Sequence, residues 1–235
     1  MEKPIRKIHF SDNPYPEGHD IIDFIWRGRI NEDETIWFDF HLKTDHYGAG
    51  TADNNEDEEN EDISDWHSRS VWNNYQSCTM SSMYWGEEGG IRIDEPDKKL
   101  NLHTAIENEL SSTDLPSDYY FEEEDLAFGL YLLGHDNCAG HTIKFIKTDH
   151  PQQYDIEWKG KIALSYSGDY EFSHDFNALI RSVEFDGFHY PKEWSLERAT
   201  EVFRAKLDGF EDYEFIDLNP KSNKREYKLC PIQQL

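Results

Sequence analysis

The amino-acid sequence predicts an α+β fold that is predominantly antiparallel β-sheet with few helices, and two observations lead to this prediction. Along several short segments apolar and polar residues alternate, which is the period of a strand with one buried face. Turn residues separate these segments at short intervals, and only residues 195–209 combine helical spacing with capping residues at both ends. Strands joined by short turns pair in an antiparallel manner, so the sheet should be mainly antiparallel.

The composition is that of a folded but strongly acidic protein. Of its 235 residues, 14% are aromatic and 37% are hydrophobic. Disordered chains are poor in aromatic residues, so we expect most of this chain to fold around Trp, Tyr and Phe side chains. The 49 acidic and 23 basic residues give a net charge of −26, which repels nucleic acid and anionic membranes. The negative net charge favours a basic protein as partner, although a need for solubility explains the charge equally well.

The first two strands are expected at residues 23–30 and 35–45. In the first, Trp26, Gly28 and Ile30 share one face and two arginines share the other. In the second, the core face carries alternate apolar residues and the opposite face carries alternate polar ones. The apolar set is Ile36, Phe38, Phe40 and Leu42, and the opposite set is Trp37, Asp39, His41 and Lys43. The acidic turn between the strands predicts an antiparallel hairpin.

A short pattern occurs twice in the chain. The segment I-x-F, a proline-containing linker and W-[RK]-G-[RK]-I begins at Ile8 and begins again at Ile143. Two copies are too few for a solenoid, and chance also gives so short a match, so the pattern suggests two pseudo-repeated halves without requiring a duplication. We expect residues 1–134 to form a β-rich first half with an acidic loop at 51–65. Residues 135–235 should form an α+β second half that packs with the first as one body.

The remaining elements are less regular. Residues 67–86 predict one or two strands, residues 89–94 another, and residues 126–136 a buried one. The helix at 195–209 has Ser195 as its expected N-cap and Gly209 just past its end. A short helix is expected near 102–110, residues 176–183 fit helix and strand equally, and residues 213–232 predict a hairpin around Asn219 and Pro220.

Two polar motifs could serve metal binding or catalysis. Residues 135–141, HDNCAGH, place His135 and His141 around Cys138, but a zinc site needs a further ligand that the sequence does not offer. A polar turn between strands is the more common explanation of this motif. Asp39, His41 and Asp45 share one strand face, which could hold a metal or an acid–base pair, whereas exposed strand faces are commonly polar in this way. We therefore predict no catalytic residues, no bound metal and no cofactor, and an enzyme is the less favoured class.

The three cysteines point to a reducing compartment. Cys78, Cys138 and Cys230 are odd in number and widely spaced, unlike a disulfide framework. The N-terminal segment lacks the apolar stretch of a signal peptide, and no run approaches the roughly 20 apolar residues that cross a bilayer. The expected localisation is cytoplasmic.

An acidic stretch at residues 53–62 contains seven acids and no basic residue, and it predicts a solvated loop. A second acidic cluster follows two tyrosines at residues 119–125. Acidic residues steer a basic partner from a distance, and neighbouring aromatic residues anchor it on contact. The residues expected to bind the partner are Glu56, Asp57, Glu58, Glu59, Glu61, Asp62, Trp66, Glu122, Glu123, Glu124 and Asp125.

In composition and size, though not in any motif, the chain resembles the small acidic proteins that neutralise a basic partner. Immunity proteins of bacterial toxin systems and phage-borne inhibitors of defence nucleases are examples. The resemblance implies a cytoplasmic inhibitor of a toxin or nuclease, and a DNA mimic is a related version. The alternatives are a metal-dependent hydrolase using Asp39, His41 and residues 135–141, and a calcium-binding or scaffold module, for which no EF-hand loop is present. The sequence specifies neither the identity of the partner nor the oligomeric state.

Overall fold

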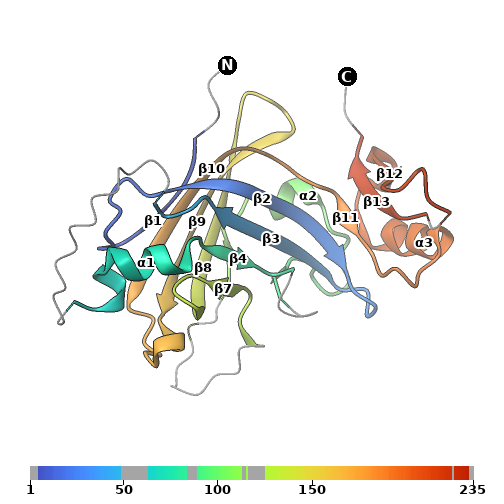
Figure 1. Cartoon of the computed structure of the whole chain (residues 1–235). Coiled ribbons are helices and arrows are strands. Elements are labelled where there is room, and N and C mark those ends of the chain that lie inside the picture. Colours follow the sequence, from blue (N-terminus) through green and yellow to red (C-terminus); the bar gives the residue numbers. More distant parts are fainter. Residues whose placement is uncertain are drawn as a thin grey trace.

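The computed structural model describes residues 5–48, 63–83, 89–112, 115, 125–223 and 225–232 (Figure 1). The strands are β1 (Arg6–Phe10), β2 (His19–Ile30), β3 (Ile36–Thr44), β4 (Thr79–Ser81), β5 (Ile91–Arg92), β6 (Leu110–Ser111), β7 (Gly129–Tyr131), β8 (His135–Lys147), β9 (Gln153–Ala163), β10 (His174–Glu184), β11 (Phe188–His189), β12 (Tyr213–Asp217) and β13 (Tyr227–Pro231). The α-helices are α1 (Arg69–Tyr75), α2 (Leu102–Ala105) and α3 (Leu196–Lys206), and the 3-10 turns are η1 (Asp65–His67), η3 (Ser165–Ser167) and η4 (Phe210–Asp212).

Eight strands close into a barrel. Each of β1, β2, β3, β4, β7, β8, β9 and β10 pairs antiparallel with the next, and β10 pairs with β1 to complete the ring. Closure satisfies the backbone hydrogen bonds that an open sheet would leave at its edges. The predicted fold class, α+β with mainly antiparallel sheet, is therefore confirmed. Strands from both halves of the chain contribute to the same ring.

Large aromatic side chains fill the barrel, as the alternation at residues 36–42 predicts. Trp26 and Phe38 lie edge to face with ring centroids 5.5 Å apart, and Phe40 lies 5.7 Å from Trp158. All four side chains are fully buried. Aromatic pairs in such geometries stabilise a core beyond the area that they bury, by roughly 0.5–1.5 kcal/mol each.

The two W-x-G-x-I segments occupy related places in the ring. Trp26 lies on β2 and Trp158 on β9, and each strand is followed by its antiparallel partner. Gly28 lies opposite Phe38 across β2 and β3, and Gly160 lies opposite Phe176 across β9 and β10. These two hairpins therefore share a local register.

The strands that precede these two hairpins, β1 and β8, pair with them in different registers. Ile8 of β1 pairs with His19, near the start of β2, whereas Ile143 of β8 pairs directly with Trp158 in β9. The likeness between the halves is thus confined to the two hairpins.

A smaller unit, made of β11, α3, β12 and β13 and called the C-terminal unit below, extends the sheet outside the barrel. β11 pairs in parallel with β2, and the antiparallel hairpin of β12 and β13 follows it, with α3 packed against them (Figure 1). Helix α3 begins after Ser195, whose side chain accepts a hydrogen bond from the backbone N–H of Arg198. The predicted helix at 195–209, the short helix near 102–110 and the C-terminal hairpin are confirmed.

Three local predictions are wrong. Residues 126–136 do not form one strand, because β7 ends at Tyr131 and β8 begins only at His135. Residues 69–75 form α1 and not a strand, because Val71, Trp72 and Tyr75 lie at helical spacing and Ser68 caps the first turn. Residues 135–141 lie within β8 and not in a turn, because β7 and β9 pair with them on both sides and a bulge between residues 139 and 142 absorbs Gly140, whose φ is 61°. Residues 176–183, which fitted helix and strand equally, form part of β10.

Candidate functional site

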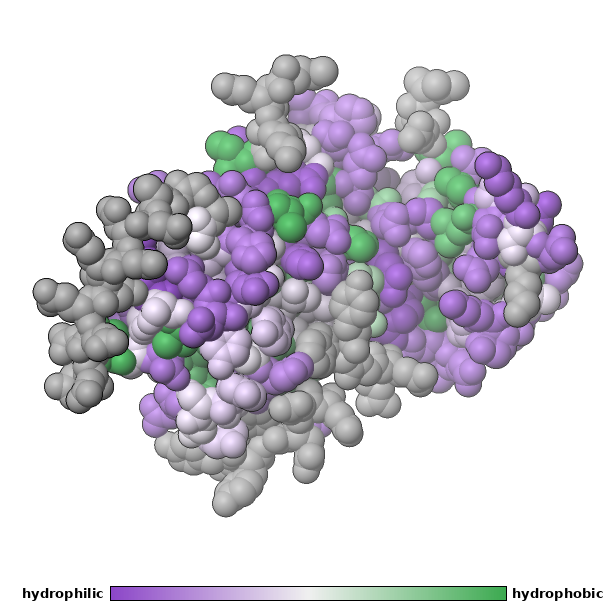
Figure 2. All heavy atoms as spheres, viewed as in Figure 1, coloured by the Kyte–Doolittle hydropathy of each residue, from purple (hydrophilic) through white to green (hydrophobic). Residues whose placement is uncertain are grey.

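Three tyrosines from distant parts of the chain meet at the end of the barrel that α1 and η1 cover. Tyr75 of α1 lies 6.3 Å, ring centroid to ring centroid, from both Tyr131 of β7 and Tyr166 of η3. Tyr166 is 62% exposed and Tyr170, on the same loop, is 48% exposed. In Figure 2, pale side chains of intermediate hydropathy gather around and below α1, bordered by purple hydrophilic ones. We call Tyr75, Tyr131, Tyr166 and Tyr170 the tyrosine surface.

The most exposed ring of this surface is held in place by buried groups beneath it. The Asp136 carboxylate accepts hydrogen bonds from the backbone N–H of Leu133, at 2.8 Å, and of Tyr166, at 3.3 Å. Burial raises the pKa of Asp136. The Tyr166 ring lies over Gly134, where a Cβ would come within 2.4 Å of it. Residue 134 therefore has to be glycine, without a Cβ, for Tyr166 to adopt this position.

Some carboxylates lie close to the tyrosine surface. Partial burial raises the pKa of Tyr75, and the neighbouring Tyr166 and the negative charge of Asp65 raise it further. Asp169 and Glu171 are exposed on the loop that carries Tyr166 and Tyr170. A basic partner would therefore meet aromatic rings and negative charge together.

The residues after the acidic stretch are anchored at this same end. Trp66 is 1% exposed, donates its indole N–H to the backbone carbonyl of Ser11 at 2.8 Å, and stacks on His174. Burial lowers the pKa of His174, and the carboxylates of Asp169 and Asp175 oppose this shift. Trp66, predicted to contact a partner, is thus packed against its own chain.

Among the other residues predicted to bind a partner, Asp125 is exposed four residues before β7. The remaining ones lie outside the described residues, and they are Glu56, Asp57, Glu58, Glu59, Glu61, Asp62, Glu122, Glu123 and Glu124. The tyrosine surface itself was not predicted, because nothing local in the sequence brings its segments together.

Two side chains on the polar face of β3, Asp39 and His41, are buried, contrary to the prediction, whereas Lys43 on the same face is exposed. Asp39 is 1% exposed and lies 3.1 Å from Nε of Arg29, and the Ser82 hydroxyl donates to it at 3.3 Å. The backbone at Gly90 passes so close that a Cβ there would lie 3.0 Å from Asp39 Oδ1. His41 is also buried, its Nε2 lies 3.7 Å from Asp23, and burial is the main cause that lowers its pKa. Asp39 is therefore neutralised by arginine and is not open to a substrate.

The candidate metal-binding side chains of residues 135–141 lie in different places along β8. His135 is exposed at the barrel end, whereas Cys138 and His141 are fully buried inside. Trp158 donates its indole N–H to Nδ1 of His141 at 3.2 Å, and burial lowers the pKa of His141 to about 3. Burial raises the pKa of Cys138, so its thiol is not a nucleophile at neutral pH. Within the described ranges, no group of three or more His, Cys, Asp or Glu side chains could hold a metal ion.

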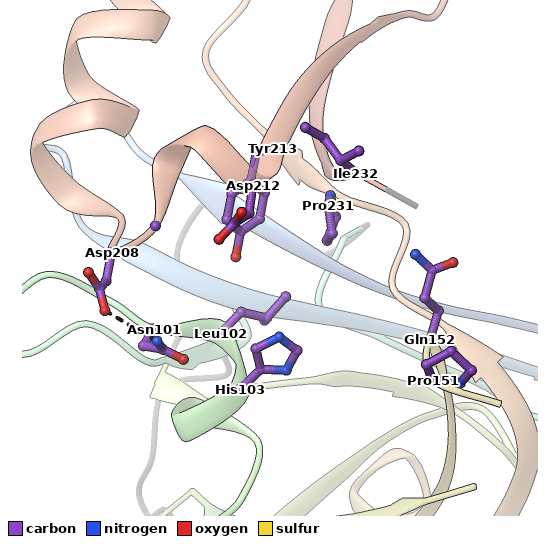
Figure 3. A pocket seen from close by; sticks show the side chains of 11 residues that line it. Asn101, Leu102, His103, Pro151, Gln152, Asp208, Asp212, Tyr213, Pro231 and Ile232 are labelled. Atoms are coloured by element: carbon purple, nitrogen blue, oxygen red, sulfur yellow. Dashed lines mark hydrogen bonds between the residues drawn. The ribbon is translucent and has the colours of Figure 1, made fainter. Parts of the chain in front are cut away.

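A pocket lies at the opposite end of the barrel, between α2, the turn from β8 to β9, and the C-terminal unit (Figure 3). Its volume is about 250 Å³. The residues that line it are Asn101, Leu102, His103, Pro151, Gln152, Asp208, Gly209, Asp212, Tyr213, Pro231 and Ile232.

Comparison with known proteins gives no match to a family model, a curated protein or a solved structure. Over the described residues, none of the helices has the length and apolar character needed to cross a membrane.

Proposed function

We propose that this protein is an acidic cytoplasmic binding protein that neutralises a basic protein partner, in the manner of an immunity or inhibitor protein acting on a toxin or nuclease. The observation that carries the proposal is the tyrosine surface, where the exposed Tyr166 ring packs over Gly134 and the Tyr166 backbone N–H donates to the Asp136 carboxylate. Tyrosine is enriched among the residues that dominate binding energy at interfaces, and a pre-positioned ring loses little conformational freedom on binding.

Charge supports the same proposal. The described residues carry 34 acidic side chains and 21 lysine or arginine side chains, a net charge of 21 − 34 = −13. The rest of the chain, which includes the acidic stretch, carries 15 acidic and 2 basic side chains, also a net charge of 2 − 15 = −13. Fields of this sign raise the association rate of a basic partner by roughly 10- to 1,000-fold. All three cysteines are free, which agrees with a reducing compartment.

Affinity capture tests the proposal. The wild-type protein, a Tyr166→Ala/Tyr170→Ala variant and an Ile216→Ala variant are immobilised and exposed to a lysate of the source cells, and captured proteins are identified by mass spectrometry. Ile216 is 41% exposed on β12, outside the tyrosine surface, so it is the matched control for loss of an exposed apolar side chain.

The expected result is a basic protein that the wild type and Ile216→Ala retain and that the double variant loses. The purified partner should then bind Tyr166→Ala at least about 10-fold more weakly than wild type, which corresponds to about 1.4 kcal/mol. Equal retention by the double variant, or capture of acidic and neutral proteins alone, would overturn the proposal.

A further inference from the structure

The pocket at the opposite end of the barrel has walls that are joined by backbone hydrogen bonds. Leu100 donates its N–H to the carbonyl of Lys206 at 2.7 Å, and its own carbonyl accepts from the N–H of Asp208 at 2.8 Å. These bonds tie the segment before α2 to the end of α3. The pocket therefore lies between two units that are fixed to each other, which is a common location for a ligand site.

Several polar groups line this pocket. The Asp208 carboxylate accepts a hydrogen bond from the Asn101 side chain at 3.2 Å. Within the described part of the chain, no protein group hydrogen-bonds to the Asp212 carboxylate, the Tyr213 hydroxyl or the His103 imidazole, and Figure 3 shows them around the same pocket. Asp212 and His103 are exposed to water, and Tyr213 is half-buried. Burial, with Asp212 and Asp208 close by, raises the pKa of Tyr213 to about 12, so its hydroxyl stays protonated and neutral.

The lining also has a definite charge and an apolar component. Asp208 and Asp212 contribute two negative charges, and neither lysine nor arginine lines the pocket. Leu102, Pro151 and Ile232 provide apolar walls. A bare metal ion would need several converging oxygen ligands and would gain nothing from these walls. An organic cation would use both parts of the lining.

We propose that this pocket binds a small organic cation, a primary amine or a guanidinium on a short alkyl chain. The charged end lies at Asp212 with the Tyr213 hydroxyl as an additional hydrogen-bond acceptor, and the alkyl part lies against Leu102 and Ile232. The residues involved belong to α2, the turn from β8 to β9 and the C-terminal unit, so the proposal does not depend on the tyrosine surface (Figure 1).

Pentylamine, pentan-1-ol and pentanoate are matched probes, because they share an alkyl length and differ in charge. Each is titrated into the ¹⁵N-labelled protein at pH 7 and low salt, and the amide shifts of the lining residues other than proline are followed by NMR. Pentylamine should shift the amides of the lining residues saturably, and pentanol and pentanoate should bind at least about 10-fold more weakly.

Two variants and one control locate the binding. Asp212→Asn should weaken pentylamine binding at least 5-fold, and Tyr213→Phe should weaken it by a smaller factor. Glu211→Gln removes the same charge one residue away from Asp212, from an exposed position that does not line the pocket, so it should weaken binding less than 2-fold. Equal binding of pentanol, an equal loss in Glu211→Gln and Asp212→Asn, or shifts confined to residues elsewhere would overturn the proposal.

Discussion

The rings of Trp66 and His174 are stacked, with centroids 3.8 Å apart and planes inclined by 14°. Trp66 belongs to η1 and His174 begins β10, so this contact joins the segment after the acidic stretch to a strand of the barrel. The indole N–H of Trp66 also donates to Ser11, between β1 and β2. Whatever the acidic stretch does, the residues that follow it hold a fixed place beside the tyrosine surface.

We predict that neutralising the acidic stretch slows capture of a basic partner without weakening the fold. The substitutions are to Gln or Asn at Glu56, Asp57, Glu58, Glu59, Glu61 and Asp62. Because exposed charges act over a screening length of about 10 Å at 0.1 M salt, the association rate should fall and lose salt dependence. The melting temperature should stay equal or rise slightly, since self-repulsion decreases.

Association and dissociation kinetics with the captured partner, measured at several salt concentrations, check this prediction. If these acids were buried against the partner, the main change would be faster dissociation. An association rate at low salt that equals the wild-type rate would leave the stretch with a solubilising role only.

Gly160→Ala should destabilise the fold by about 1–3 kcal/mol, because the interior has no room for a methyl group there. A Cβ at this position would lie 2.6 Å from a ring carbon of Phe176 and 2.7 Å from Nδ1 of His141. Gly48→Ala is the control, since its Cβ would meet Asn73 at an ordinary 3.4 Å and should change stability by less than about 0.5 kcal/mol. Urea unfolding of both variants measures the difference, and equal stabilities would contradict the described packing.

Asp39→Asn should lower the free energy of unfolding by about 2 kcal/mol, because it removes the negative charge that pairs with Arg27 and Arg29 inside the fold. Arg29 has an 18% exposed side chain, so water compensates for part of the loss. Asp175→Asn breaks the exposed ion pair with Lys161, at 2.8 Å, and should change stability by at most about 1 kcal/mol. Denaturation of the two variants side by side tests the contrast, and a larger effect at Asp175 would refute it.

Stability should fall as the pH drops below about 6.5. Burial lowers the pKa of His19 to about 4 and that of His141 to about 3, from 6.5 for an unperturbed histidine. Below pH 6.5 the unfolded chain takes up protons that the folded protein excludes, so each histidine lowers the free energy of unfolding by roughly 1.4 kcal/mol per pH unit until its folded pKa is reached. Above pH 6.5 the two histidines no longer reduce the free energy of unfolding.

Urea unfolding at pH 7.5, 6.5 and 5.5 measures this slope. In parallel, the imidazole NMR signals of His19 and His141 should stay unchanged between pH 7.5 and 5.5. Titration of either signal near pH 6.5 would show that the ring is accessible to protons in the folded state and would contradict its burial.

The features that the sequence could predict are those that depend on residues close together in the chain. The alternation at residues 36–42 identifies the face of β3 that fills the barrel, and the serine at 195 identifies the start of α3. Asp39 also lies where the alternation places it, on the opposite face. Its burial depends on Gly90, which passes over it from a distant segment, so no local pattern could indicate it.

The tyrosine surface was beyond prediction for the same reason. Tyr75, Tyr131 and Tyr166 come from three segments, and only the closing of the barrel brings their rings together. In sequence each is one tyrosine among 13. The pocket at the opposite end likewise depends on where the C-terminal unit packs.

The two strands that close the barrel, β1 and β10, leave the ribosome at different times during protein synthesis. β1, at residues 6–10, closes the ring with β10, at residues 174–184. At about 5–20 residues per second, a ribosome releases β1 roughly 10–30 seconds before β10. Through that interval the nascent chain can build β2 and β3 onto β1, but the other edge of β1 stays unpaired. A chaperone that binds exposed strand edges would therefore act on this protein until β10 leaves the ribosome.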